Sequence, residues 1–263
     1  MFLSPQASAE TVLLPDSRDL QYRTYGLFFD EQSTLVYRNG GHAQGALGGT
    51  LAILEERDWL WEPQLIIHGS ANSAFTLNSR GDTLLTETVD ARVGLAMDLR
   101  FNESFRGTLI WTHQSGHISD NVPDPDLIGS NLGNEIITLR LIRDFAREWR
   151  FGAGLRPSVG SDPGLKVFGA EQFAEWFPWH ASEDIHRFSP FVAVGFEEYG
   201  RQEIDFTFNG MIGLAAGDHF SESKHPGLRV VLGYYNGADP RLKYFQFKNS
   251  KVGFVYGGLM FDI

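Results

Sequence analysis

One segment of the chain constrains the fold more than any other, because its two faces require opposite surroundings. In an extended strand over 86–100, alternate residues share a face. One face carries Val89, Ala91, Val93, Leu95, Met97 and Leu99, and the other carries Thr88, Asp90, Arg92, Gly94, Ala96, Asp98 and Arg100. No soluble core accepts Asp90, Arg92 and Asp98 on one strand. Two surroundings fit: an open sheet with one wet face, or a membrane barrel with an apolar exterior and a polar lumen.

The same alternation recurs along the chain. We expect an irregular first strand at 20–29 and regular strands at 43–53, 59–68, 86–100, 105–119, 135–143, 150–158, 165–176, 188–197, 204–214, 228–235 and 251–263. Charged residues join the polar faces of later strands, among them Arg140, Arg150, Arg156, Glu171 and Asp205. About twelve strands of roughly 9 to 14 residues have the length that crosses a bilayer at a tilt. The sequence therefore predicts an all-β fold, a transmembrane antiparallel β-barrel; a soluble sandwich or jelly roll is the alternative.

The connections between the expected strands alternate in length. Short turns follow Leu54, Arg100 and Phe145, and longer polar loops follow Phe29, Ser70 and His117, while the segments around Ser182 and Asp218 are long for the tight rim. Short periplasmic turns with longer outer loops are typical of outer-membrane barrels. Tryptophans lie near strand ends, where a membrane interface favours them: Trp59, Trp61, Trp149, Trp176 and Trp179.

The composition of the chain limits which cellular compartment and which binding partners we expect. The 263 residues include no cysteine, which suits an oxidising compartment, and no run of 18 apolar residues that would predict a transmembrane helix. The net charge of -11 argues against a nucleic-acid partner, because phosphates require a basic face.

The two chain ends fit export to the bacterial outer membrane. Ala7-Ser8-Ala9 has the form of a signal-peptidase site. We therefore expect residues 1–9 to be the remnant of a signal peptide, 10–19 a loose periplasmic segment and 20–263 the barrel. The final strand is apolar at alternate positions to its end, as a substrate of the barrel assembly machinery would be, although Ile263 stands where such signals usually have Phe.

The apolar face of the expected strand 105–119 ends in two reactive groups. Phe105, Leu109, Trp111, His113 and Ser115 share that face. Two residues apart, His113 and Ser115 lie about 7 Å from each other at Cα. Serine becomes a nucleophile when a base takes its proton, and the base needs an orienting partner. Glu135 begins the apolar face of the next strand at the same rim, so we expect Ser115, His113 and Glu135 to converge as nucleophile, general base and orienter.

Several stretches resemble an uncharacterised family of bacterial outer-membrane barrels, a domain of unknown function with a His-x-Ser-x-His-x-x-Asp strand motif. Here the motif is His113, Ser115, His117 and Asp120. The likeness extends to Leu14-Pro15-Asp16-Ser17-Arg18, to Leu84-Leu85, and to the stretch from Tyr234 to Pro240 followed by Phe245. Gly116 stands where Ser is common, and the usual Ser-Pro before the final loop is absent. The resemblance implies an outer-membrane location and no activity.

A second resemblance is to outer-membrane phospholipase A and lipid A deacylase barrels, which carry an outward-facing His-x-Ser pair with Asn or Glu on an adjacent strand. The stretch from Trp111 to Gly116 is similar to that segment. This resemblance implies hydrolysis of acyl esters in outer-membrane lipids or lipopolysaccharide. The Asn-Gly that follows the serine of the phospholipase is missing, which leaves a calcium cofactor open.

Other interpretations of these residues remain open. His113 and Ser115 could be ordinary rim residues of a passive barrel, either a narrow pore or a structural protein whose lumen is filled by charged side chains. His117 and Asp120 could hold a divalent ion. If Ser115 is a nucleophile, backbone amides near Gly116 are the expected oxyanion donors.

Overall fold

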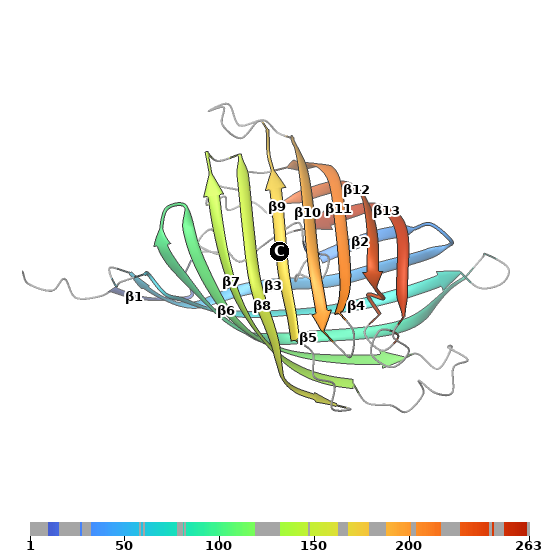
Figure 1. The fold of residues 1–263 in the computed structure, drawn as a ribbon, viewed down its shortest axis with the longest axis horizontal. Coiled ribbons are helices and arrows are strands. Elements are labelled where there is room, and N and C mark those ends of the chain that lie inside the picture. The colour runs from blue at the N-terminus through green and yellow to red at the C-terminus, as the bar shows by residue number, and fades with distance from the viewer. Residues whose placement is uncertain are drawn as a thin grey trace, which may run out of the picture.

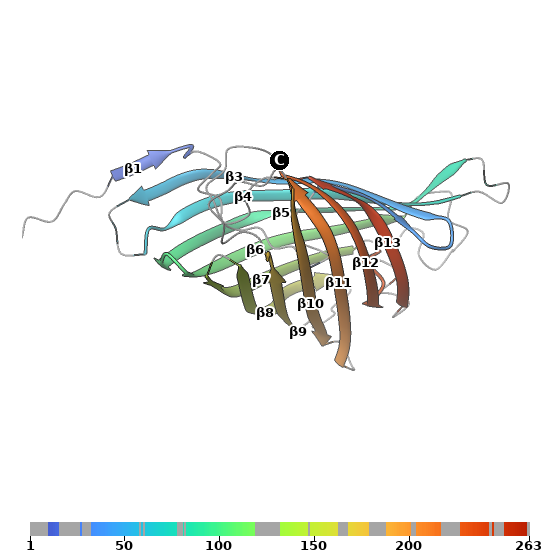
Figure 2. The ribbon, with the colours of Figure 1, turned by 90° about the horizontal axis from the view of Figure 1, so that it is seen from above.

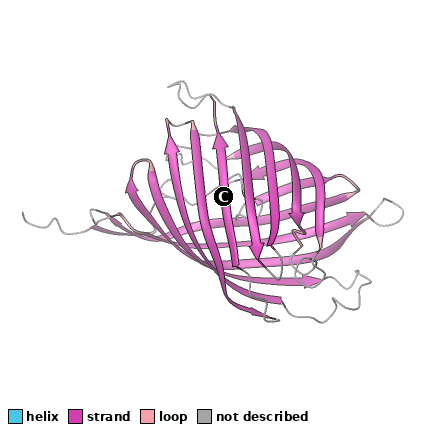
Figure 3. Cartoon of the chain, in the orientation of Figure 1, coloured by secondary structure: helices cyan, strands magenta, loops and turns pink. Residues whose placement is uncertain are grey.

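The computed structural model describes residues 10–15, 27, 33–57, 59, 61–77, 81, 83–118, 132–146, 148–162, 168–178, 188–200, 204–216, 227–241, 244 and 250–261. Nearly all of them lie in strands (Figure 3). The strands are β1 Glu10–Leu13, β2 Ser33–Arg38, β3 His42–Arg57, β4 Gln64–Leu77, β5 Leu84–Asn102, β6 Phe105–Ile118, β7 Leu132–Phe145, β8 Trp149–Asp162, β9 Phe168–Trp176, β10 Ser189–Gly200, β11 Ile204–Ala216, β12 Leu228–Ala238 and β13 Lys251–Phe261.

Twelve of these strands form a closed antiparallel barrel. From β4 to β13 each strand pairs with the next, β13 then pairs with β2, β2 with β3, and β3 with β4, so that the ring closes. Figure 1 shows β9, β10 and β11 running upright in front while β3, β4 and β5 cross behind them. Figure 2, seen from above, shows β10 to β13 curving away from the wall that β3 to β6 form. The predicted all-β barrel of about twelve strands is confirmed.

β1, which lies outside the ring of twelve strands, corrects the expectation of a loose N-terminal segment. β1 pairs with Leu54–Arg57 of β3, while β2 pairs only with His42–Ala46 at the other end of that strand. The short β2 leaves part of the β3 edge uncovered, and β1 fills it, because an unpaired edge leaves its backbone groups without partners. Residues 16–19 of the expected segment lie outside the described residues.

The first barrel strand also differs from the prediction. The strand expected at 20–29 lies outside the described residues except for Leu27, which is buried against Ile142 and Phe173 inside the barrel. Residues 33–38, predicted to belong to a long loop, form β2. The connection from β2 to β3 is the tight turn 39–41, in which Gly40 and Gly41 adopt φ of 90° and 83°. The prediction of a long outer loop after Phe29 is therefore wrong, because the connection into β3 at this rim is the turn 39–41.

The connections between the barrel strands lie on two rims. We call the rim that carries the start of β2 and the end of β13 the terminal rim; its connections are 58–63, 103–104, 146–148, 177–188 and 217–227. The opposite rim has the connections 39–41, 78–83, 119–131, 163–167, 201–203 and 239–250. Three of the five terminal-rim connections are short, as expected, but 177–188 and 217–227 are long, and the opposite rim also has the short connections 39–41 and 201–203.

The faces of the strands divide as the alternation predicts. Val93, Leu95 and Met97 are 53%, 43% and 37% exposed on the outer wall, whereas Arg92, directly before Val93, is 7% exposed. The other buried charges of the predicted lumen set are Asp90, Asp98, Arg140, Arg150 and Glu171. Arg156 is also largely buried, and the side chain of Asp205 is not among those that the structure describes. The exterior is apolar, and the interior holds both these charged side chains and an apolar cluster that includes Phe191, Tyr235 and Tyr256.

Ion pairs line the inner face of the barrel from β7 to β10. Arg140 Nε donates to Glu171 Oε1 at 2.5 Å, and Arg156 Nε lies 3.6 Å from the other oxygen of Glu171. Arg156 Nη1 in turn donates to Glu197 Oε1 at 2.5 Å. The chain of charges joins β7, β9, β8 and β10, so the interior of this wall is filled by mutually neutralising side chains.

The connection after β12 reaches across the mouth of the opposite rim. Arg241 donates to Asp239 Oδ2 at 2.6 Å and to Glu87 Oε2 of β5 at 3.1 Å, and its guanidinium lies 4.0 Å from the ring centroid of Tyr244. Burial alone lowers the pKa of Arg241, but the hydrogen bond and charge of Asp239, with the charge of Glu87, raise it above its usual range. Arg241 therefore stays charged and ties this connection to a distant strand.

Aromatic side chains gather at the terminal rim. Trp149 stacks on Trp176 and on Phe151, with centroid separations of 5.5 and 5.8 Å, and Trp61 meets Phe101 edge-on. The predicted position of tryptophans near strand ends is confirmed for Trp59, Trp61, Trp149 and Trp176, and Trp179 lies outside the described residues. No helix in the described part of the chain is long and apolar enough to span a bilayer.

Candidate functional site

A polar patch lies on the outer wall, on β6 and β7 near the opposite rim. Four side chains form it: His113, Ser115 and His117 on β6 and Glu135 on β7. They occupy the same face as the exposed Leu109, Trp111 and Leu139, because residues two apart on a strand share a face. Imidazole, hydroxyl and carboxylate groups on a wall that is otherwise apolar are costly unless they pair or have a function.

His113 and Glu135 are joined directly. They stand opposite each other in the register of β6 and β7, and His113 Nδ1 lies 2.6 Å from Glu135 Oε1. With the proton on Nδ1, this nitrogen donates to the carboxylate and Nε2 is left as the acceptor. The side chains are 41% and 35% exposed. A carboxylate on Nδ1 is the arrangement that orients a histidine to act as a general base through Nε2.

A bulge and two glycines, at which an added Cβ would make only ordinary van der Waals contact, flank this pair. A Cβ at Gly133 would lie 3.9 Å from His113 Cε1, and a Cβ at Gly160 would lie 3.4 Å from Glu135 Cγ. Between β7 and β8 the register shifts at Glu135, so that Val159 is an extra residue opposite this position. Bulges re-aim side chains and are frequent beside functional sites. The local backbone therefore directs the Glu135 carboxylate towards β6.

Ser115 lies beside the pair in a gap of the outer wall. Its partners in the register are Ala91 of β5 and Gly133 of β7, both too small to cover the hydroxyl. Among the side chains that the structure describes, none forms a hydrogen bond with Ser115 Oγ, so the contact with His113 Nε2 is not made. Hydrogen bonds of this kind are often long in the absence of substrate and tighten when it binds.

The height of the patch can be derived from the strand geometry. Ser115 is ten residues along β6 from Phe105, which lies at the terminal rim. At about 3.3 Å per residue and a tilt of about 40°, ten residues rise roughly 25 Å. An outer-membrane barrel carries an apolar band about 25 Å tall. Ser115 thus lies at the upper edge of such a band, while Leu109 and Trp111 lie within it.

His117 shares the outer face of β6, and its register partner is Val89 of β5. The second weak metal candidate, Asp120, lies outside the described residues. Within the described part of the chain, no three His, Asp or Glu side chains are grouped so that they could hold a metal ion. The metal interpretation of His117 with Asp120 stays a prediction.

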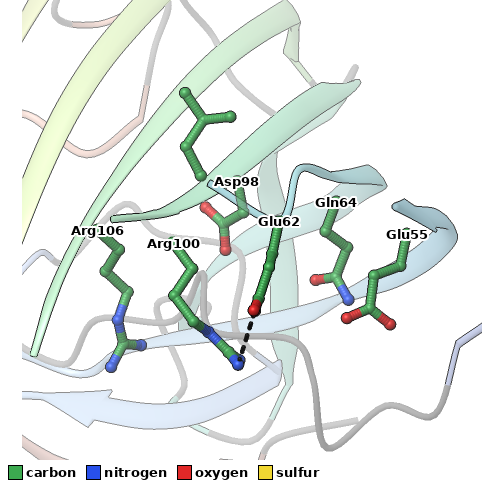
Figure 4. A pocket seen from close by; sticks show the side chains of 7 residues that line it. Glu55, Glu62, Gln64, Asp98, Arg100 and Arg106 are labelled. Atoms are coloured by element: carbon green, nitrogen blue, oxygen red, sulfur yellow. Dashed lines mark hydrogen bonds and ion pairs between the residues drawn. The ribbon is translucent and has the colours of Figure 1, made fainter. Parts of the chain in front are cut away.

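A pocket inside the barrel is separate from the patch. It lies at the terminal rim between Glu55, Glu62, Gln64, Asp98, Leu99, Arg100 and Arg106 (Figure 4). Arg100 pairs with Glu62 at 3.3 Å, and Arg106 pairs with Asp144 at 2.5 Å. Its charged groups are thus mostly neutralised within the protein, and neither a serine nor a histidine lines it, which leaves the outer patch as the candidate site.

Two parts of this arrangement do not follow from the sequence. The bulge at Val159 is not visible in the alternation of β8, which continues through it. The opposition of His113 and Glu135 depends on the length of the connection 119–131, although Gly133 and Gly160 in a strand are a signal for close approach.

No family model matches the chain, and no curated protein matches it in sequence.

Proposed function

We propose that the protein is an integral barrel of the bacterial outer membrane that hydrolyses acyl esters of outer-leaflet lipids. The observation that carries this proposal is the 2.6 Å contact between His113 Nδ1 and Glu135 Oε1 on the outer wall, with Ser115 on the same face two residues away. The closed barrel with exposed apolar and buried charged residues supports a membrane location. The short turns 103–104 and 146–148 favour the periplasm for the terminal rim.

The chemistry is acyl transfer through serine. Ser115 Oγ attacks the ester carbonyl carbon while its proton moves to His113 Nε2, and the carbonyl π electrons move to oxygen. The tetrahedral intermediate collapses, the bond to the lipid alkoxide breaks, and the proton on His113 passes to that alkoxide. Water, deprotonated by His113, then attacks the acyl-serine, and a fatty acid leaves as Ser115 regains its proton. Glu135 stabilises the imidazolium formed in both halves.

The position of the site suits a lipid ester. Acyl esters lie at the boundary between hydrocarbon and headgroups, and Ser115 lies at the edge of the apolar band. Trp111 and Leu109 continue below it at 42% and 40% exposure, and they offer an apolar track for the acyl chain. Phospholipid and the acylated sugar of lipopolysaccharide share this ester chemistry, and both are proposed substrates.

A passive pore is the alternative, and the interior argues against a wide one. The ion pairs from Arg140 to Glu197 and the Arg241 contacts with Glu87 occupy the lumen and its mouth. Steady conductance in planar bilayers, with no lipid products, would select the pore.

The test is fatty-acid release from phospholipid or lipopolysaccharide in mixed micelles, with and without calcium. We expect release by the wild type and a loss of at least about a thousandfold in Ser115→Ala. Ser73→Ala is the matched control, because Ser73 on β4 also faces outward near the opposite rim and lies beside Val89. Equal release by the wild type and Ser115→Ala, or none by either, would contradict the proposal.

A further inference from the structure

Attack on an ester creates an oxyanion, and the strand around Ser115 restricts what can stabilise it. Gly116 pairs with Asp90 of β5 on one side and with Leu132 of β7 on the other. Ser115 likewise pairs with Ala91 and Gly133. The backbone amides here belong to ladders on both sides of β6, and their N–H groups lie in the plane of the sheet. The expectation of backbone donors near Gly116 therefore has no support, and the donor has to be a side chain on the outer face.

His117 is the side chain that meets this requirement. It faces outward two residues beyond Ser115, about 7 Å away at Cα, and His113 stands the same distance on the other side. No hydrogen bond or ion pair joins His117 to the residues that the structure describes. Its register partner on β5, Val89, carries no polar group. An imidazole N–H is thus available on the side of Ser115 opposite the base.

We infer that His117 donates a hydrogen bond to the oxyanion that forms when Ser115 attacks the lipid ester. The inference rests on the proposed function, and it adds a catalytic residue to the set Ser115, His113 and Glu135. The proton that leaves Ser115 goes to His113, so His117 keeps its own proton throughout and contributes only electrostatic stabilisation. The two histidines flanking Ser115 therefore have different roles: His113 bonds a carboxylate, and His117 does not.

The experiment compares His117→Ala with the wild type in the mixed-micelle assay. Loss of one oxyanion donor lowers kcat by about a hundred- to a thousandfold. We expect that loss with KM changed less than about threefold, and partial recovery in His117→Asn, whose amide still donates. Val89→Ala is the control for damage to the wall beside His117.

Binding of a long-chain trifluoromethyl ketone separates this role from a structural one. Its adduct with serine carries an oxyanion, so His117→Ala should weaken its inhibition constant by about the same factor as kcat, while inhibition by a long-chain alcohol stays unchanged. Unaltered kcat in His117→Ala, with Ser115→Ala inactive, would overturn the inference and leave the hydrolase standing. Absence of any hydrolysis by the wild type would overturn both.

Discussion

At the scale of single residues, the proposed function depends on the hydrogen bond between His113 and Glu135. Period-two alternation was sufficient to place His113 and Ser115 on one face, because a strand allows no other arrangement. The role of Glu135 required the register, since a shift of one residue would turn it to the lumen. The sequence shows the residue types and the faces, whereas the 2.6 Å contact depends on the connection 119–131 and on the bulge at Val159.

At this scale we predict the effect of Glu135→Gln. The amide oxygen still accepts from His113 Nδ1, but the charge that stabilises the imidazolium is lost. We expect lipid hydrolysis to fall about ten- to a hundredfold, less than in Ser115→Ala. The matched control is Glu198→Gln, the same change at an outward position of β10 that pairs with Ala170 and Phe206. A loss equal to that of Ser115→Ala would assign Glu135 a larger role than an orienter.

Individual strands were the most predictable level of the structure. β5 to β8 extend over the predicted segments, with ends displaced by a few residues, because charged residues alternate with aliphatic ones in each. The errors concentrate where local pattern is weak: Ser33–Arg38 follows polar residues, and Glu10–Leu13 owes its strand to an uncovered edge of β3. Pairing with a distant strand, rather than propensity, decides such segments.

For β5 we predict opposite tolerance on its two faces. Leu95→Arg places a charge on the outer wall near the middle of the apolar band and should reduce stability by about 2 to 4 kcal/mol. Arg92→Gln on the same strand should cost less, because its side chain faces the polar lumen. Refolding into lipid vesicles at graded urea concentrations measures both. A larger loss for Arg92→Gln than for Leu95→Arg would reverse the assignment of the faces.

Across the whole molecule, an apolar exterior surrounds an interior of charged, polar and apolar side chains, and the candidate site lies on the exterior. The interior was predictable as a set of charges but not as a network, because the partners of Arg140 and Arg156 lie on strands far along the chain. The crossing from Arg241 to Glu87 likewise joins residues that only barrel closure brings together. Ion pairs of this kind neutralise the lumen and leave catalysis, on this account, to the outer wall.

The most direct test of that account is the covalent labelling of the folded barrel by a long-chain alkyl fluorophosphonate, located by mass spectrometry of the peptides. An activated serine displaces fluoride, whereas ordinary serines do not react. We predict one phosphonylated residue, Ser115, in protein that has the heat-modifiable gel mobility of a folded barrel, and strongly reduced labelling in His113→Asn. Labelling that is absent, that falls on another serine, or that persists unchanged in His113→Asn would contradict a serine hydrolase on the outer wall.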